Sequence, residues 1–279
     1  MMSGRKITIN RILLIIDYRI FKNNLKKLLI LAVYAINLKK LKSDSSILNV
    51  QGFLSDSPSL LNELCDKYGS DKGSSTLGMK PYPWPPHNYT AIYSLIFGLS
   101  RLSVRNVLEC GIGTNNPHKK SNMSKLGKPG ASLRVWRDFF PLAEIYGVDI
   151  DPKTLCHENR IKSFEVDQTS KSSIERFKVQ IPNLEFDIII DDGLHEFFAG
   201  QNFFINTFGI LRNGGFYVIE DIIPSDIEKY RQYFSKIKIP FSVYFFNDRS
   251  AKRSLDNVMI LIQKLNFNEN FLKIDLITT

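Results

Sequence analysis

The sequence predicts an α/β protein with a Rossmann-like, doubly wound sheet of seven mostly parallel strands and an antiparallel last strand. From residue 104 onward, short runs rich in β-branched and aromatic residues alternate with helical runs, which is typical of a parallel sheet. The last two strand candidates are joined only by residues 247–257, and a link this short favours an antiparallel pair. A chain of 279 residues with 43% hydrophobic and 23% charged residues is expected to be globular.

The elements follow from the hydrophobic pattern and from the turn residues between them. Strands are expected at residues 105–109, 144–149, 161–166, 186–191, 215–220, 242–246 and 258–263. Helices are expected at residues 60–68, 131–140, 171–179, 197–211 and 226–237. Residues 43–59 are rich in Ser, Asp and Pro and are interpreted as a linker. The predicted division is a basic amphipathic helical extension (1–50), a linker with an N-terminal cap or substrate segment (51–103), and the α/β domain (104–279).

The net charge of +9 is concentrated near the N-terminus, where residues 1–50 carry ten basic and two acidic side chains. The remaining chain is nearly neutral and has no basic stripe, which argues against nucleic-acid binding. The apolar runs at 12–16 and 28–38 are shorter than the roughly 20 residues that a membrane span needs. Two interpretations of this extension stay open: packing on protein, including a second copy in a homo-oligomer, or binding to an anionic membrane surface. The predicted location is the cytoplasm, with peripheral attachment to the inner membrane face as the alternative.

The first strand of the α/β domain ends in Glu109, Gly111 and Gly113, at the edge where doubly wound sheets bind ligands. A dinucleotide fingerprint would need a third glycine at position 116, which is Asn116, and a helix directly after it. A carboxylate here would repel a pyrophosphate but suits the cationic S-adenosylmethionine. The sequence therefore favours S-adenosylmethionine over NAD as cofactor.

Acidic residues end the next two strands as well. Asp149 can accept hydrogen bonds from both hydroxyls of a cofactor ribose. Asp167, after the third strand, is positioned to accept a bond from the adenine amino group. These residues extend the predicted cofactor site along the edge of the sheet.

The fourth and fifth strands deliver more carboxylates to the same edge: Asp191 and Asp192, then Glu220 and Asp221. Carboxylates this close repel one another unless a cation lies among them, and oxygen ligands favour Mg²⁺. His195, three residues after Asp192, is a candidate general base for a substrate hydroxyl. The structural alternative is that Asp191 caps the following helix and His195 only completes a loop.

Seven motifs occur in order and together resemble one family: residues 67–73 (KYGSDKG), 87–90 (HNYT), 108–113 (LECGIG), 130–141 (GASLRVWRDFFP), 146–151 (YGVDID), 191–195 (DDGLH) and 214–221 (GGFYVIED). The chain is similar to class I S-adenosylmethionine-dependent methyltransferases of the macrolide-sugar and rhamnosyl O-methyltransferase group, which is related to cephalosporin hydroxylase. The resemblance implies magnesium-dependent O-methylation. It implies metal ligation by Asp192, Glu220 and Asp221, cofactor contacts from Glu109, Gly111, Asp149 and Asp167, and His195 as base, with Asp191 and residues 67–73 bordering the pocket.

The chain departs from the family pattern at Leu194, where a serine is usual, and in the basic insertion at residues 115–129. The lysines of this insertion are candidates for contacting an anionic substrate, with a solvated loop as the alternative. The expected acceptor is a small molecule or glycan, such as a sugar or surface-polysaccharide precursor, with a phosphorylated or phosphoramidate group as a related class. Two other functions stay open: a metal-dependent hydroxylase-like oxidoreductase and a non-catalytic protein with the same fold.

Overall fold

The computed structural model describes residues 46–52, 59–74, 82, 84, 87–237, 241–248 and 258–265. They belong to a compact unit that spans Ser45–Thr279. The expected helical extension lies outside the described residues up to residue 45. Among the helices that the structure describes, none combines the length and the apolar character that crossing a membrane requires.

The described strands form one eight-stranded sheet in the order β1-β7-β8-β6-β5-β2-β3-β4. The last strand, β8, runs antiparallel to both of its neighbours, and the other neighbouring pairs are parallel. The expected seven-stranded, mostly parallel sheet is therefore confirmed, with one strand added at its edge. The strands are β1 Ser46–Gly52, β2 Asn106–Cys110, β3 Glu144–Asp149, β4 Ile161–Glu165, β5 Phe186–Asp191, β6 Leu211–Ile222, β7 Phe241–Asp248 and β8 Val258–Lys264.

The added strand, β1, corrects the interpretation of residues 43–59 as a linker and moves residues 46–50 out of the helical extension. It pairs in parallel with β7, from Ser46 opposite Ser242 to Gly52 opposite Asp248. An edge strand has a ladder partner on only one side and tolerates polar residues. Its mixture of polar and apolar residues therefore gave no clear strand signal.

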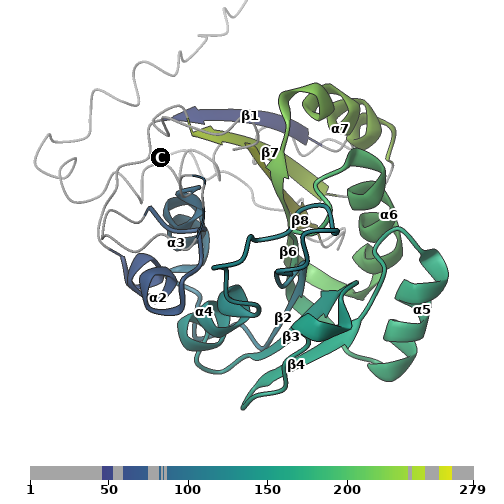
Figure 1. Cartoon of the computed structure of the whole chain (residues 1–279). Coiled ribbons are helices and arrows are strands. Elements are labelled where there is room, and N and C mark those ends of the chain that lie inside the picture. The colour runs from purple at the N-terminus through teal and green to yellow at the C-terminus, as the bar shows by residue number, and fades with distance from the viewer. Residues whose placement is uncertain are drawn as a thin grey trace, which may run out of the picture. The chain divides into compact units, whose positions relative to one another are not determined.

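The helices cover both faces of the sheet, with α2, α3 and α4 on one side and α5, α6 and α7 on the other (Figure 1). Helix α3 was not predicted, and the helix expected at 197–211 ends earlier, in a short 3₁₀ turn at Phe208–Ile210. The bounds are α2 Leu60–Tyr68, α3 Tyr89–Phe97, α4 Ala131–Phe139, α5 Lys171–Gln180, α6 Phe197–Thr207 and α7 Pro224–Lys236.

The connections create a switch point between β2 and β5, which are neighbours in the sheet. From β2 the chain continues outward to β3 and β4, whereas from β5 it proceeds in the opposite direction to β6. The chain therefore leaves β2 and β5 in opposite directions, and ligands of doubly wound sheets bind at such a switch point, outside the carboxyl ends of the strands. Every residue of β5 is buried, as expected for a central strand that is covered on both faces.

Helices α2 and α4 are joined by the carboxylate of Asp138. Its oxygens accept hydrogen bonds from the Tyr68 hydroxyl at 2.5 Å, the Lys67 ammonium at 3.1 Å and the Arg137 guanidinium at 2.9 Å. Burial raises the pKa of Asp138, but these three partners outweigh it and lower the pKa to about 2. This contact ties α2, and the segment that follows it, to the sheet.

We expect Asp138→Asn to lower the free energy of unfolding by about 1 kcal/mol at pH 7. Because the folded pKa lies below the unfolded value of about 4, this stabilisation is present above pH 4. It is lost as the pH falls through 2. Urea unfolding of both proteins at pH 7 and pH 3 measures this, and a difference that grows in acid contradicts it.

Candidate active site

A cavity of about 580 Å³ lies at the carboxyl ends of β2, β3, β5 and β6. This volume is in the range of small-molecule sites. Its wall is built by the turn after β2, the end of β3, the loops after β4 and β5, the last residues of β6 and the start of α4. Further parts of the wall come from the loop after α2, with Ser70, Asp71 and Lys72, from the insertion, with residues 118–123, and from Tyr82, Trp84, His87 and Tyr89.

The turn after β2 runs close against the end of β5. Gly111 has a φ of +83°, and a Cβ on it would lie 2.0 Å from the carbonyl oxygen of Asp192. Gly113 has a φ of +88° and, like Gly111, lines the cavity. Glycine at position 111 is therefore required both by the backbone conformation and by the close approach.

Asp149, at the end of β3, holds this turn in place and also lines the cavity. One carboxylate oxygen accepts from the Ile112 amide at 3.0 Å, and the other accepts from the Asp151 amide at 2.9 Å. The side chain is buried, and burial raises its pKa. Asp149 therefore couples the shape of the glycine turn to the cavity wall.

Two of the predicted cofactor residues lie behind the wall, outside the described lining. The Glu109 carboxylate is fully buried and accepts from the Ser132 hydroxyl at 2.6 Å. Asp191 accepts from the Gln168 side-chain amide at 3.0 Å and from the Gly193 amide at 3.3 Å, and burial raises its pKa to about 6. The expectation that Asp191 borders the pocket is therefore corrected.

The structural alternative in which Asp191 caps the helix after β5 does not describe this loop. The first amide of α6, that of Phe197, donates to Asp226 at 3.2 Å, so Asp191 is not the cap of this helix.

Asp167, after β4, lines the cavity as predicted for a residue at that strand end. One of its oxygens accepts from the Thr169 amide at 2.9 Å and from the Thr169 hydroxyl at 2.6 Å.

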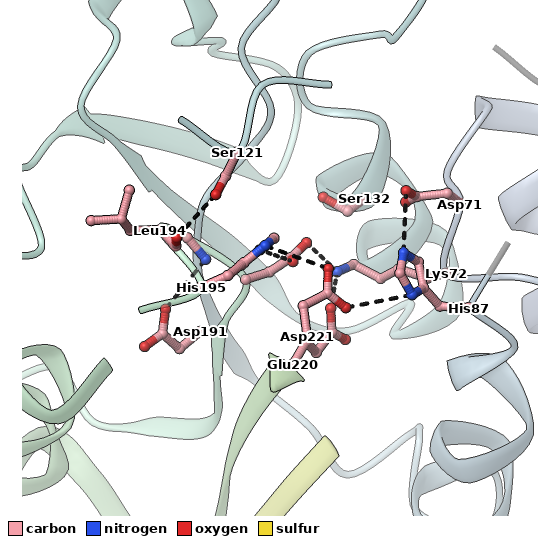
Figure 2. Close-up of polar contacts among 12 residues, drawn as sticks. Asp71, Lys72, His87, Ser121, Ser132, Asp191, Leu194, His195, Glu220 and Asp221 are labelled. Atoms are coloured by element: carbon pink, nitrogen blue, oxygen red, sulfur yellow. Dashed lines mark hydrogen bonds and ion pairs between the residues drawn. The ribbon is translucent and has the colours of Figure 1, made fainter. Parts of the chain in front are cut away.

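Asp192, His195 and Asp221 form an acidic cluster in the cavity, with one potential ligand atom from each lying within 4.8 Å of the others. His195 Nε2 lies 3.2 Å from Asp192 Oδ1, and Nδ1 lies 3.7 Å from Asp221 Oδ2. Figure 2 shows His195 on one side of Asp221, and Lys72 and His87 on the other side. The sequence predicted that these three side chains meet, and the structure brings them together.

The charges in this cluster determine its protonation. Burial lowers the pKa of His195, but Asp221, Asp192 and Asp191 outweigh it and raise the pKa to about 10. Burial also opposes ionisation of Asp192, but Lys72 and His195 lower its pKa. The carboxylates therefore favour the protonated form of the imidazole, whose positive charge offsets theirs.

Glu220, the third predicted metal ligand, lies outside this cluster of ligand atoms. One of its oxygens is bound by the Lys72 ammonium and the other by the Tyr93 hydroxyl at 2.5 Å. The same ammonium contacts Asp192 Oδ2 at 2.5 Å and lies 3.4 Å from Glu109 Oε1. Both Glu220 oxygens thus have partners, and His195 rather than Glu220 completes the cluster with Asp192 and Asp221.

Asp221 has two further neighbours that come from the start of α3. The Tyr89 hydroxyl donates to Asp221 Oδ1 at 2.6 Å, and His87 Nδ1 lies 3.5 Å from the same oxygen. His87 Nε2 is 3.8 Å from Asp71. Two residues of the predicted motif at 87–90 therefore contact the site at Asp221.

The insertion contributes His118–Met123 to the wall, including Lys119 and Lys120, whereas Lys125 and Lys128 are not among the described lining residues. Lys120 forms an exposed ion pair with Glu196 at 2.7 Å. Leu194 takes part in the site through its backbone: its carbonyl accepts from the Ser121 hydroxyl at 3.0 Å, and its amide donates to Gln168 at 2.6 Å.

Several residues of the site were not singled out individually from the sequence, although residues 67–73 were expected to border the pocket: Lys72, Tyr89, Tyr93, Ser132 and Gln168. For Lys72 a signal existed, since the excess of carboxylates at the strand ends requires a cation nearby. Because Lys72 lies 37 residues before the first of these carboxylates, Glu109, sequence spacing alone could not identify it as their partner.

No family model matches the chain. Among solved structures, it is similar to MycE methyltransferase of the mycinamycin biosynthetic pathway in complex with Mg and SAH. The TM-score is 0.54 at 24% identity, covering 76% of this chain and 56% of that one. A second MycE structure, which also contains mycinamycin VI, gives a TM-score of 0.55 at the same identity.

Curated relatives are O-methyltransferases. A tetracenomycin-C 3'-O-methyltransferase from Streptomyces olivaceus, whose full name specifies a 2-methoxy-alpha-L-rhamnosyl substrate, is 36% identical over 166 residues, 59% of this chain and 37% of that one. Mycinamicin VI 2''-O-methyltransferase from Micromonospora griseorubida is 36% identical over 136 residues, 49% of this chain and 32% of that one. The chain thus aligns with about a third of the length of these relatives.

The sheet order, the antiparallel β8 and the similarity to MycE define the fold as the Rossmann-like fold of class I methyltransferases. Within that class, the chain is related to the S-adenosylmethionine-dependent O-methyltransferases of the macrolide-sugar group.

Proposed function

We propose that the protein transfers a methyl group from S-adenosylmethionine to a hydroxyl oxygen of a glycosylated small molecule or saccharide precursor. The observation that carries this proposal is a single cavity whose wall holds two chemically different groups of residues, which we call its two ends. One group is the glycine turn with Asp149, and the other is the acidic cluster.

The first end fits an adenosyl cofactor. The turn at Gly111 leaves no room for a Cβ, so the backbone itself forms the surface that the cofactor would meet. Asp149 and Asp167 place carboxylates at the ends of neighbouring strands, where they can accept bonds from ribose hydroxyls and an adenine amino group. Glu109 would act at a distance, through the negative charge that it places behind Ser132.

The second end fits a divalent cation. Asp192 and Asp221 offer the carboxylate oxygens that Mg²⁺ prefers, and we propose them as its ligands. Glu220, which shares the Lys72 ammonium with Asp192, is proposed as the third ligand, as the resemblance implies. When bound, a divalent cation lowers the pKa of a substrate hydroxyl and offsets the carboxylate charges that raise the pKa of His195.

His195 is the proposed general base. Its imidazole lies beside both Asp192 and Asp221, so a hydroxyl at the acidic cluster lies within its reach. The imidazole takes the hydroxyl proton while the oxygen forms a bond to the methyl carbon and the sulfur–methyl bond breaks. The products are the methyl ether and the neutral thioether of the cofactor, so the reaction balances without any redox reagent.

The acceptor class follows from the relatives and from the wall of the cavity. The related enzymes are named for rhamnosyl and macrolide substrates. Tyr82 and Trp84 line the same cavity with their rings 5.3 Å apart, a surface suited to an apolar sugar face. Lys119 and Lys120 on the insertion favour an acceptor that also carries an anionic group, such as a sugar phosphate.

Calorimetric titration of the protein with S-adenosylmethionine, and separately with NAD, each with and without Mg²⁺, tests this function. We expect S-adenosylmethionine to bind in the micromolar range or tighter and NAD not to bind. Binding of NAD would support an oxidoreductase, and failure to bind either ligand would support a non-catalytic role.

A further inference from the structure

Gln168 links the loops that follow two strands which are not neighbours in the sheet. The residue follows β4, whereas its side chain bonds to the loop after β5, and β2 and β3 lie between these two strands. Gln168 is 7% exposed and lines the cavity. A buried carboxamide needs partners for both its donor and its acceptor groups, and the loop after β5 supplies them.

The carboxamide of Gln168 holds this loop at two points. Its Nε2 donates to Asp191 Oδ1 at 3.0 Å, and its Oε1 accepts from the Leu194 amide at 2.6 Å. Gly193 lies between these two points, and a Cβ on it would be 2.0 Å from Gln168 Oε1. The glycine at position 193 therefore leaves the space that the Gln168 side chain occupies.

The bond to Leu194 bears on His195, which is the next residue. The Leu194 amide is held by Gln168, and its carbonyl accepts from the Ser121 hydroxyl at 3.0 Å (Figure 2). His195 has a φ of +60°, a left-handed conformation that is uncommon for residues other than glycine. Such a conformation persists where the surrounding structure determines it, and here the preceding residue is fixed at both its amide and its carbonyl.

The other side of Gln168 belongs to the adenosyl end of the cavity. Gln168 directly follows Asp167, which we propose as the acceptor for the adenine amino group. The Gln168 carbonyl accepts from the Asn202 side-chain amide on α6 at 2.7 Å, so the backbone at this position is anchored as well. One side chain therefore connects the adenosyl end of the cavity with the loop that carries His195.

We propose that Gln168 is a positioning residue for methyl transfer. Its carboxamide places the loop that carries Asp192 and His195 relative to the adenosyl end of the cavity, and it acts through the backbone of that loop. This inference rests on the proposed function, since His195 is the proposed general base. A misplacement of a reacting group by about 1 Å lowers a rate by about 100-fold, so a side chain that only places the loop has a large expected effect.

Gln168→Met tests the proposal because methionine keeps the length of the side chain but forms neither hydrogen bond. At saturating S-adenosylmethionine we expect kcat to fall by about 10–100-fold, while the Kd for the cofactor stays within about threefold. Gln180→Met, at the end of α5 and outside the described lining of the cavity, is the matched control and should keep kcat. A weaker affinity for the cofactor with unchanged kcat, or a loss of stability alone, overturns the proposal.

A swapped pair of variants keeps the proposal testable if Gln168→Met does not fold. Gln168→Glu keeps the acceptor for the Leu194 amide but places a second carboxylate against Asp191, so kcat should fall. Adding Asp191→Asn returns a donor opposite the new carboxylate. The double variant should therefore recover kcat to within about tenfold of the unmodified protein. A double variant no more active than Gln168→Glu overturns the proposal.

A spectroscopic measurement separates this inference from the proposed function. The chain has four histidines, so the imidazole NMR signal of His195 can be assigned with His195→Gln. In Gln168→Met, or in Gln168→Glu if the former does not fold, we expect this signal to shift. The signal of His157, which is exposed and lies outside the described lining of the cavity, should stay in place.

The two possible failures then differ. A shifted His195 signal in a protein that does not bind S-adenosylmethionine would overturn the proposed function and support the placement of the loop by Gln168. An unshifted His195 signal in the folded variant overturns the role of Gln168, whether or not the protein binds the cofactor.

Discussion

Replacement of His195 by glutamine is expected to lower kcat for methyl transfer by about 10²–10⁴-fold, the usual contribution of a general base. Glutamine can still form a hydrogen bond with Asp192 but cannot take a proton at neutral pH. The affinity for S-adenosylmethionine should stay within about twofold, because His195 belongs to the other end of the cavity. Steady-state kinetics with an accepted sugar substrate and calorimetry with the cofactor measure the two effects.

The pH profile makes this prediction specific. The carboxylates raise the pKa of His195, so the rate of the unmodified enzyme should increase with pH as the imidazole loses its proton. His195→Gln should lack this acidic limb. His118→Gln, in a histidine that lines the cavity from the insertion, is the control and should keep it. A His195→Gln enzyme with nearly full kcat would show that the base lies elsewhere.

The central strands of the fold were predictable because burial on both faces gives an unambiguous pattern. The bounds of β3 and β5 were predicted without error, since each is an apolar run that ends in an acid. Two elements escaped prediction. Strand β1 lies at the edge of the sheet, where polar residues are tolerated. Helix α3 begins just after a proline-rich stretch of sequence, which concealed the start of the helix.

For the site, the sequence predicted which residues lie at the strand ends, but it did not predict which of their side chains reach the cavity and which are buried behind its wall. Asp149, Asp192 and Asp221 reach the cavity as expected, because the carboxyl ends of parallel strands share an edge. Asp191 is the last residue of β5 and Asp192 is the next residue, and only Asp192 lines the cavity, since successive side chains of an extended chain alternate between its two faces. The partner of Glu220 is Lys72, and only the folded chain brings the loop after α2 onto β6.

Asp149→Asn is expected to weaken the binding of S-adenosylmethionine by about 100-fold. The two Asp149 oxygens accept from the Ile112 and Asp151 amides, and asparagine offers one acceptor oxygen and one NH₂ group in their place. One buried backbone donor is then left without a partner and the glycine turn loses an anchor. A negative charge that would accept from the ribose hydroxyls is lost at the same time. Calorimetry gives the affinity, and Glu165→Gln, at the exposed end of the neighbouring strand β4, is the matched control.

A 2'-deoxy analogue of the cofactor separates the two roles of Asp149. If the carboxylate binds the ribose directly, removing the 2'-hydroxyl should weaken binding to the unmodified protein much more than to Asp149→Asn, because the two changes remove the same interaction. If Asp149 only anchors the turn, the hydroxyl should be worth the same in both proteins. Equal affinity of Asp149→Asn and Glu165→Gln for the cofactor would contradict both roles and would place the adenosyl end of the site away from β3.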